Sequence, residues 1–439
     1  MDEYLNTLLE QIRCKKARPY IRQELQNHIE DQIDANLSAG MNKKDAELEA
    51  VRDMGDPVKA GISLDRIHRP QIAWKLLLII SLLSIAGILL QTAIGLAFGN
   101  TEGYSSGRYI AHVIIGLAVM CGLYLLDYTL LARYSKIIAL LLNIMCFSTF
   151  YFGNMINGMR YFSLLGYPIP AWSFMLFYVP VYGSILYKYR GQGYTDLIRA
   201  ALWMLVPVIL VLRLPSITIA GLLLASMLVM LTIAIYKGWF SVQKPLAISA
   251  IWCIFLVIPC ALLVVLYYSH RFAPYQMARI QAFASGSEEN YMQNLLHPFL
   301  HSSNLIGSNG INVAETLPEF RTDYILTCLT SMYGIIPAIL LCCVIAVLIT
   351  AIFHSAFRQK NQLGMLMGCG CGMVFLISFL INVLKNVCLF PSSMTFLPFI
   401  SAGGSHIVVS YGLLGIVLSI YKYKNIYPQH VNVSLLKNE

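Results

Sequence analysis

Charged side chains are scarce in this sequence. Aspartate, glutamate, lysine and arginine make up 12% of its 439 residues, whereas hydrophobic residues make up 57%. Soluble domains carry roughly 25% charged residues, so a chain with half that share cannot cover a water-facing surface. The scarcity excludes a soluble enzyme, a disulfide-rich secreted module and a disordered regulator. It indicates an integral membrane protein with several spans.

Several other features are missing. The sequence has no phosphate-binding loop and no dinucleotide fingerprint, which argues against an ATP-driven pump. The first long apolar run begins near Ile72, so we expect no N-terminal signal peptide. The eleven cysteines lie mostly within apolar runs, where cysteine behaves as a small hydrophobe, and no structural disulfide is expected.

The charges that are present are unevenly distributed. Residues 1–71 hold 13 of the 22 acidic residues but only 11 of the 31 basic ones. Residues 1–71 are therefore slightly acidic, and the positive net charge of the whole chain, +9, comes from its apolar remainder. In a membrane protein such an excess reflects topology, so no nucleic-acid partner is expected.

Residues 1–71 predict a small helical domain. Apolar residues recur there at helical spacing, Asn42 and Asp56 are suitable N-caps, and Gly40 and Gly55 are suitable helix stops. The stretch resembles the short helical prefix domain found ahead of some bacterial permease-like membrane proteins. That resemblance implies a regulatory or docking module, and the alternative is a solubilising cytoplasmic cap.

Ten apolar segments are long enough to cross a bilayer. They cover residues 73–98, 109–131, 135–156, 170–187, 197–213, 215–235, 246–268, 324–353, 363–388 and 405–422. An even number of spans places both termini on one side. Loops and tail on that side carry twelve basic residues against seven on the other side, which predicts cytoplasmic termini.

The predicted fold is thus an all-α polytopic membrane protein with about ten transmembrane helices over 72–425. A small cytoplasmic helical domain precedes it and a cytoplasmic tail, 426–439, follows. Asp127 is the only acidic residue well within a predicted span. We expect its side chain to reach the membrane interface, or alternatively to pair with Arg133.

One connection, residues 269–323, is much longer than the others, and long structured loops usually carry function. It holds five of the nine acidic residues found outside 1–71, namely Glu288, Glu289, Glu315, Glu319 and Asp323. Clustered charge in an outer loop at a membrane surface suits a polar substrate with a lipid tail. The alternative is a solvated loop with incidental charge.

Three stretches resemble one family. They are Leu317–Leu326, Asn382–Ser405 with its Pro-Phe-Ile-Ser-Ala-Gly-Gly-Ser box, and, more weakly, Gly158–Gly166. Together they are similar to the SEDS family (shape, elongation, division and sporulation), which RodA, FtsW and SpoVE typify. Its members usually have ten spans and a large outer loop between spans seven and eight, and the resemblance extends over about residues 72–425.

The resemblance implies a peptidoglycan glycosyltransferase that polymerises lipid II at the outer face of the bacterial cytoplasmic membrane, in shape maintenance, division or sporulation. It also implies a class B penicillin-binding transpeptidase as partner. In this reaction the 4-hydroxyl of one sugar attacks the anomeric carbon of another, and undecaprenyl pyrophosphate leaves. The chemistry needs a base near the hydroxyl and positive charge near the pyrophosphate.

Asp323 matches the family's essential acid, and partial burial would raise its pKa towards that of a useful base. The alternative is that Thr322 or Asp323 only caps the following helix. Glu319 would orient Arg321 or, together with Asp323, bind a divalent cation. No other cofactor is expected.

The candidates for pyrophosphate binding are arginines, which offer a two-pronged donor to phosphate oxygens. They are Arg160, Arg271, Arg279 and Arg321. Each of them could instead anchor to lipid headgroups. The run before the last span is predicted to line the cavity, or alternatively to form a tight turn. It contains Ser401, Gly403, Gly404 and Ser405.

The match fails at several polar positions. The family usually has a serine–glutamate pair at the start of span four with a lysine three residues on, but residues 171–177 keep only Ser173. An aspartate between spans five and six is replaced by Leu214-Pro215-Ser216. These losses weaken the case for full activity. Three functions therefore stay open: a glycosyltransferase, a non-catalytic regulator or scaffold of a cell-wall synthase, and a lipid-linked precursor flippase.

Overall fold

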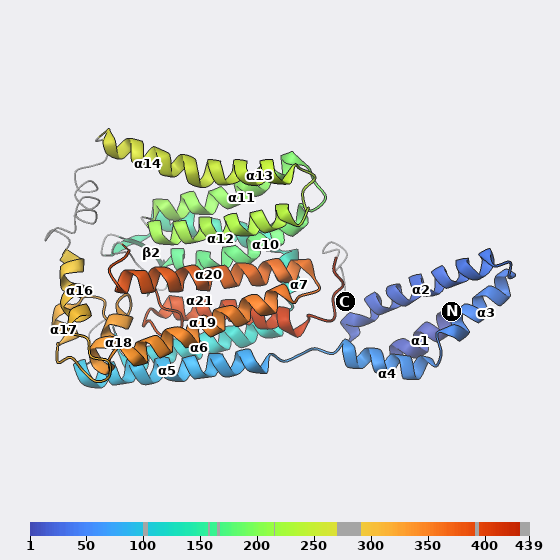
Figure 1. Cartoon of the computed structure of the whole chain (residues 1–439), viewed down its shortest axis with the longest axis horizontal. Coiled ribbons are helices and arrows are strands. Elements are labelled where there is room, and N and C mark those ends of the chain that lie inside the picture. Colours follow the sequence, from blue (N-terminus) through green and yellow to red (C-terminus); the bar gives the residue numbers. More distant parts are fainter. Residues whose placement is uncertain are drawn as a thin grey trace.

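The structure is a computed structural model of the whole chain. It describes residues 1–99, 104–156, 159–164, 167–214, 216–269, 291–390 and 395–430. A bundle of nearly parallel helices forms one part, and a smaller group of helices, the head, projects from one end of that bundle (Figure 1). The chain beyond the last long helix returns to the same end as the head (Figure 1).

The head contains four α-helices. They are α1 (Asp2–Glu10), α2 (Arg18–Ser38), α3 (Lys43–Asp53) and α4 (Pro57–Ile67), with a short 3-10 helix, η1 (Lys15–Ala17), before α2. The capping residues act as the sequence predicts. The Asn42 side chain accepts a hydrogen bond from the Asp45 backbone amide at 2.9 Å, and the Asp56 carboxylate accepts one from the Val58 amide at 2.8 Å.

Nine helices among the described residues are long and apolar enough to cross a membrane. They are α5 (Trp74–Phe98), α6 (Ser106–Leu125), α8 (Ser135–Phe152), α11 (Tyr194–Arg213), α12 (Ile217–Tyr236), the continuous helical run Lys244–Ala261, α19 (Ile335–Phe357), α20 (Gln362–Asn386) and α21 (Gly404–Lys422). Each overlaps one of the ten predicted spans. The protein is therefore an α-helical, multi-pass membrane protein.

The remaining predicted span, 170–187, is helical but not uniform. It consists of α9 (Ala171–Phe174), the 3-10 segment η2 (Met175–Phe177) and α10 (Tyr178–Lys188). All ten residues Tyr178–Tyr187 of α10 are buried. The tighter 3-10 turn interrupts the α-helix, which is why no single long helix forms here.

Two predicted spans are broken at identifiable residues. The expected span 324–353 divides into α18 (Ile325–Tyr333) and α19 because Gly334 has a φ of 97°. A Cβ atom at Gly334 would lie 2.6 Å from the Leu305 carbonyl oxygen, so only glycine fits. The expected span 109–131 ends at Leu125, and Asp127 caps a separate short helix, α7 (Tyr128–Arg133).

A small antiparallel sheet was not predicted. It contains β1 (Asn154–Ile156), β2 (Met159–Leu164) and β3 (Tyr167–Ile169), in the order β1-β2-β3. The predicted third span, 135–156, therefore ends early, at Phe152. A Cβ atom at Gly153 would lie 2.9 Å from the Tyr161 carbonyl oxygen, so the hairpin folds closely over the end of α8. The dipeptide between β1 and β2 is Asn157-Gly158, a hairpin signal that the sequence contains.

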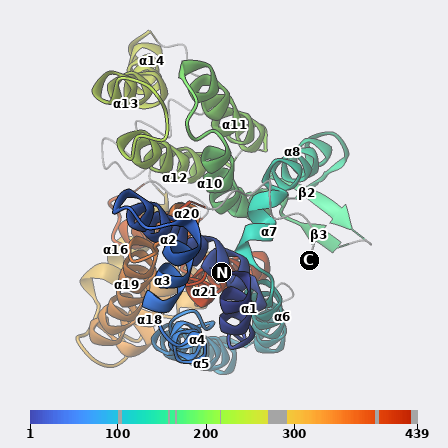
Figure 2. The same ribbon diagram turned by 90° about the vertical axis from the view of Figure 1, so that its right-hand side faces the viewer.

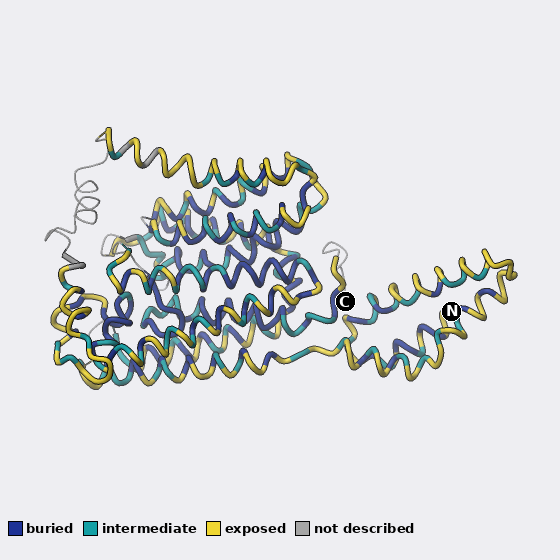
Figure 3. The backbone as a smooth tube through the Cα atoms, viewed as in Figure 1, coloured by how far each residue is buried: buried dark blue, intermediate teal, exposed yellow. Residues whose placement is uncertain are grey.

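Helices α20 and α21 form the centre of the bundle. Helix α20 packs against α10, α12, α19 and α21, and α21 packs along α6. Figure 3 shows these central helices as mostly buried, whereas buried and exposed residues alternate along outer helices such as α5 and α19. The run formed by α13 (Lys244–Trp252), the π-helical segment η3 (Cys253–Val257) and α14 (Ile258–Tyr268) lies at one edge of the bundle (Figure 2).

The head is joined to the bundle at Asp127. The Asp127 carboxylate is 3% exposed and lies 2.7 Å from the Lys16 ammonium of the head. The Tyr427 hydroxyl donates to the same carboxylate, and the Thr129 backbone amide donates to it at 2.9 Å. The sequence did not predict these partners from the head and the tail. That the Asp127 side chain reaches the membrane interface or pairs with Arg133 stays a prediction.

The connection before α18 is described over Tyr291–Tyr324. It contains α16 (Tyr291–His301) and α17 (Val313–Thr316), and it lies at the end of the bundle opposite the head (Figure 1). Backbone hydrogen bonds tie it to the break between α18 and α19. The Gly307 amide donates to the Tyr333 carbonyl at 2.9 Å, and the Ile335 amide donates to the Asn304 carbonyl at 3.0 Å.

Candidate functional site

The two sequence boxes that carry the family resemblance meet at the end of the bundle opposite the head. The Ser401 hydroxyl donates to the Thr322 carbonyl at 2.7 Å and accepts from the Leu397 amide at 2.8 Å. The Ala402 amide donates to the Arg321 carbonyl at 2.9 Å. These bonds hold the segment 317–324 against the segment 395–403.

A glutamine in the first long helix joins the same two segments. Gln91 of α5 is 2% exposed, and its side-chain amide donates to the carbonyls of Arg321 (3.1 Å) and Ile400 (2.9 Å). Sequence analysis missed this residue. A lone amide within an apolar helix was the available signal, because a polar side chain in a span needs partners.

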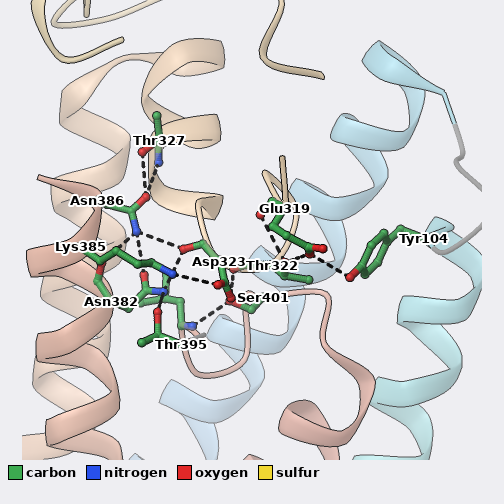
Figure 4. Close-up of polar contacts among 11 residues, drawn as sticks. Tyr104, Glu319, Thr322, Asp323, Thr327, Asn382, Lys385, Asn386, Thr395 and Ser401 are labelled. Carbon is green, nitrogen blue, oxygen red and sulfur yellow. Dashed lines mark hydrogen bonds and ion pairs between the residues drawn. The ribbon is translucent and has the colours of Figure 1, made fainter. Parts of the chain in front are cut away.

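Asp323 is held from one side by the last turn of α20. Its Oδ2 atom lies 3.2 Å from the Lys385 ammonium, and its backbone carbonyl accepts from the side-chain amides of Asn382 and Asn386, each at 3.2 Å (Figure 4). The side-chain oxygen of Asn386, Oδ1, accepts a hydrogen bond at 3.1 Å from the backbone amide of Thr327, which lies in the first turn of α18. The end of α20 therefore fixes both Asp323 and the start of α18, the helix that follows Asp323.

None of these three α20 residues was predicted to be part of the site. Lys385 was counted only as an outer basic residue. Asn382, Lys385 and Asn386 are spaced i, i+3 and i+4, which places them on one face of a helix. That spacing of polar residues in an otherwise apolar span was the signal in the sequence.

The pKa of Asp323 is raised to about 6. Burial is the main cause, the negative charge of Glu319 adds to it, and the Lys385 ammonium together with the Thr395 backbone amide opposes it. The side chain still keeps 19% of its surface exposed. Asp323 therefore combines access from outside with a proton affinity in the range of a general base.

The backbone around the site is strained at three positions. Among the described residues, the non-glycine residues with positive φ are Glu319 (54°), Cys388 (61°) and Phe399 (68°). Residues other than glycine adopt a positive φ only at a cost in conformational energy, and residues with this backbone conformation cluster at functional sites. All three lie in the segments that surround Asp323.

The Glu319 carboxylate points away from Asp323, towards Tyr104 (Figure 4). Its Oε2 atom accepts from the Tyr104 hydroxyl at 3.1 Å and from the Thr322 hydroxyl at 2.6 Å. Burial and the Glu319 charge raise the pKa of Tyr104. Glu319 and Asp323 thus have separate partners, and a divalent cation shared by the two carboxylates stays a prediction.

Arg321 is 2% exposed and turned into the protein. Its guanidinium donates to the backbone carbonyl of Gly99 and, at 3.4 Å, to that of Tyr104. Burial lowers the pKa of Arg321. Its contacts hold Gly99, at the end of α5, and Tyr104. They differ from the predicted contact with Glu319.

The other predicted arginines lie elsewhere. Arg160 is on β2, where its guanidinium donates to the Phe150 carbonyl and lies 4.7 Å from the centre of the Phe150 ring. Its neighbour Tyr161 feels the charge of Glu319, which together with burial raises the pKa of Tyr161. The hairpin therefore reaches towards the site. Arg271 and Arg279 lie outside the described residues.

The run before the last span begins α21, with Gly403 as the N-cap. A Cβ atom at Gly404 would lie 2.5 Å from the His112 ring of α6, so this glycine allows a close approach of that side chain. The Ser405 hydroxyl lies 3.5 Å from that of Ser173, which lies 3.5 Å from Nε2 of His406. The surviving Ser173 thus meets the 401–405 box.

The proposed capping role of Thr322 or Asp323 is wrong. Helix α18 begins after Tyr324, whose side chain makes no cap hydrogen bond. The Thr322 hydroxyl bonds back to Glu319, and the Asp323 carboxylate pairs with Lys385. Chemically, the site offers a buried but accessible carboxylate with a charged partner, set in segments fixed by hydrogen bonds.

Comparisons with curated proteins place this arrangement among known relatives. The probable peptidoglycan glycosyltransferase FtsW of Wigglesworthia glossinidia brevipalpis is 25% identical over 358 residues, covering 76% of this chain and 90% of that protein. The protein of the same name from Enterococcus hirae is 33% identical over 125 residues, covering 28% of this chain and 31% of that protein.

Solved structures show the same fold. A chain in the structure described as "structural coordination of polymerization and crosslinking by a peptidoglycan synthase complex" matches with a TM-score of 0.65 at 18% identity, covering 80% of this chain and 97% of that chain. The rod shape determining protein RodA of Thermus thermophilus matches with a TM-score of 0.59 at 16% identity, covering 80% and 97%.

A family model described as "cell cycle protein" matches residues 69–426, which include every long helix of the bundle and both boxes of the site. This protein therefore belongs to the FtsW/RodA/SpoVE family of cell cycle proteins, the SEDS family.

Proposed function

We propose that this protein is a peptidoglycan glycosyltransferase that polymerises lipid II, with Asp323 as its general base. The observation that carries the proposal is the setting of Asp323. Its carboxylate is largely buried but 19% exposed, it is paired with a lysine, and it lies where the two family boxes meet. The names of the FtsW relatives support the same reaction class.

In the proposed reaction, the 4-hydroxyl oxygen of the acceptor sugar attacks the anomeric carbon of the donor. The Asp323 carboxylate takes the hydroxyl proton, the new glycosidic bond forms, and the bond from the anomeric carbon to the pyrophosphate oxygen breaks. Undecaprenyl pyrophosphate leaves with the bonding electron pair. A pKa of about 6 leaves Asp323 mostly ionised at neutral pH, as a base must be.

Positive charge is needed near the leaving pyrophosphate. We assign this role to Arg160 and Arg279. Arg321 is 2% exposed and donates to two backbone carbonyls, whereas Arg160 is only partly buried. Arg160 is on the hairpin whose Tyr161 feels the charge of Glu319. The Ser401 hydroxyl bonds to the backbone of Leu397 and Thr322, so its proposed contribution is to hold the two segments together.

The proposal includes an orientation and a partner. The head and tail would be cytoplasmic in a bacterial cytoplasmic membrane, and the Asp323 end would face outwards, where polymerisation takes place. The excess of basic residues on the head side supports this orientation. The partner would be a class B penicillin-binding transpeptidase, because the matched synthase complex is described as coordinating polymerization with crosslinking.

Lipid II polymerisation by the purified full-length chain tests the proposal, with and without a class B transpeptidase. Wild type should form polymer, and Asp323→Ala should not. Glu315→Gln is the matched control, because Glu315 is an exposed acid of the same connection that accepts a hydrogen bond from Asn312. Equal polymer from wild type and Asp323→Ala would overturn the role of Asp323.

A regulatory or scaffold role is the second candidate, and α9 with η2 favours it. These segments keep Ser173 but present only apolar residues where the family usually has a glutamate and a lysine. Wild type that binds a transpeptidase but forms no polymer with it would overturn the glycosyltransferase proposal and support this one.

A further inference from the structure

The last turn of α20 presents a buried lysine to Asp323. The Lys385 side chain is 1% exposed, and its ammonium lies 3.2 Å from Asp323 Oδ2 and 4.6 Å from the centre of the Tyr324 ring. Asn382 and Asn386, on the same helix face, are 0% and 4% exposed and bind the Asp323 backbone carbonyl. Main chain and carboxylate of Asp323 are thus both held by one helix turn (Figure 4).

An ammonium in this place is costly for the fold. Ionisable residues within transmembrane helices are expensive and mark functional sites. A buried ion pair is also seldom more stable than well-packed apolar side chains of the same volume. Stability therefore does not explain why α20, apolar over most of its length, ends its buried face with Lys385.

On the opposite side of the site, residues 171–177 of α9 and η2 contain no charged side chain. Ser173 of α9 touches His406, whose ring stacks on Phe396 at a centroid distance of 4.2 Å, next to Thr395 beside Asp323. This places α9 and η2 against the site. Residues 174–177 are apolar, however, and the nearby Arg321 donates to backbone carbonyls. In the described part of the chain, Lys385 is the cation paired with Asp323.

We propose that Lys385 is the positioning residue for Asp323, supplying from α20 the positive charge that residues 174–177 do not provide. Its ammonium keeps the Asp323 carboxylate ionised and holds its Oδ2 atom on the α20 side of the site. The inference rests on the proposed function, in which Asp323 acts as a base. It assigns to this chain a lysine that the family resemblance does not predict at this position.

Among the described residues, two other titratable groups act on Asp323 through their charge or are acted on by it: Glu319 from its own segment and Tyr104 from the residues before α6. Tyr324, at the start of α18, contacts the Lys385 ammonium, and the 395–402 segment contributes the Thr395 amide. Removal of Lys385 leaves burial and Glu319, which both favour the protonated acid. An opposite charge at this distance lowers a carboxyl pKa by about 1–3 units, so its loss should raise the pKa by a similar amount.

The test uses full-length Lys385→Met and Lys385→Arg, with Lys75→Met as a matched control, because Lys75 is an exposed lysine at the start of another span. Two readouts are taken against pH. One is the rate of lipid II polymerisation, and the other is the infrared carbonyl stretch of the protonated carboxyl, assigned by its loss in Asp323→Asn. The second readout does not depend on catalysis.

In Lys385→Met, the pH at which the polymerisation rate falls and the midpoint of the infrared titration should both rise by about 1–3 pH units. Activity should recover at high pH. Lys385→Arg and Lys75→Met should titrate like wild type. An unchanged infrared titration in Lys385→Met would overturn the proposal. If Lys385→Met does not fold, Lys385→Gln gives the same comparison with an uncharged side chain that can still donate a hydrogen bond.

The two proposals fail in different ways. If wild type has no polymerase activity but Lys385→Met still shifts the infrared titration, the glycosyltransferase proposal is overturned. The inference that Lys385 keeps Asp323 ionised is then retained. The other outcome is that wild type is active, while Lys385→Met is inactive at every pH and shows no infrared shift. Lys385 would then have only a structural role, and the inference would be overturned.

Discussion

Asp323 is set between two opposing influences. Burial and the charge of Glu319 favour its protonated form, while Lys385 and the Thr395 amide favour the carboxylate. The result is a pKa of about 6, well above that of an exposed aspartate. A general base works best with a pKa near the operating pH, so this balance suits the proposed reaction.

The pH dependence of polymerisation follows from this balance. Only the ionised carboxylate accepts a proton, so the rate should fall as the pH decreases through about 6, by about tenfold for each further unit. The measurement is the initial rate of polymer formation against pH at fixed lipid II. A rate that stays constant down to about pH 4.5 would mean that Asp323 titrates as an exposed acid or is not the base.

Gly404 lies near the site at a position with no room for a side chain. Alanine there would place a Cβ atom 2.5 Å from the His112 ring. We expect Gly404→Ala to lose about 1–3 kcal/mol of stability through overpacking, measured as a lower thermal midpoint in detergent.

Gly107→Ala is the control for this variant, because nothing lies within 4 Å of the added atom. Combining Gly404→Ala with His112→Ala should restore much of the loss by removing the obstructing ring. A Gly404→Ala protein as stable as the control would mean that α6 and α21 are less closely packed here than the structure indicates.

At the scale of single residues, the sequence predicts the acid better than its surroundings. Asp323 and Ser401 belong to contiguous boxes, so pattern alone identifies them. Lys385 and Gln91 are far from Asp323 along the chain and reach the site only through the packing of α20 and α5. Arg321 has the right chemistry for a pyrophosphate, but its burial directs it to backbone carbonyls.

At the scale of elements, one hydroxyl joins the two segments of the site. Ser401→Ala removes a donor to the Thr322 carbonyl and an acceptor for the Leu397 amide, and both groups are buried. We expect a loss of about 1–3 kcal/mol in stability, the usual range for unsatisfied buried polar groups, together with reduced activity.

Ser81→Ala is the comparison, because the Ser81 hydroxyl bonds to the Leu78 carbonyl of its own helix at an exposed position. Both variants are measured by thermal midpoint in the same detergent. Equal midpoints for the two variants would show that the 317–324 and 395–403 segments are held together by other contacts.

Sequence patterns predict most long helices because apolar length is decisive in a membrane. They fail where a local backbone feature intervenes. Gly334 divides the eighth predicted span, Asp127 caps a new helix within the second, and a 3-10 turn interrupts the fourth. The hairpin after α8 was missed because its strands are short, although its Asn157-Gly158 turn signal is plain in the sequence.

At the scale of the whole molecule, a buried carboxylate lies at the junction of the head and the bundle, beside ring contacts such as Tyr20 with Tyr427. Lys16 and Tyr427 both bind Asp127, so the head, the start of α7 and the chain after α21 meet at one point. Lys16→Met leaves the buried carboxylate without its cation. A loss of about 1–2 kcal/mol there would raise the fraction of opened heads about 5- to 30-fold.

Limited trypsin digestion after Arg66, in the last turn of α4, measures that opening, because Asn425 binds the carbonyl of the next residue, Ile67, when the head is closed. Lys16→Met should be cleaved there faster than wild type, whereas Lys15→Met, which replaces an exposed neighbour, should not. Equal cleavage of all three proteins would contradict a head held by the Lys16–Asp127 pair.

The central claim is that Asp323 accepts the proton in lipid II polymerisation. The most direct measurement is the rate of polymer formation by Asp323→Asn relative to wild type, for folded full-length proteins under identical partner conditions. Asparagine keeps the shape of the side chain but cannot act as the base. General-base catalysis contributes about 10²- to 10⁴-fold, so a loss of that size is predicted. An Asp323→Asn rate within about twofold of wild type would contradict the account.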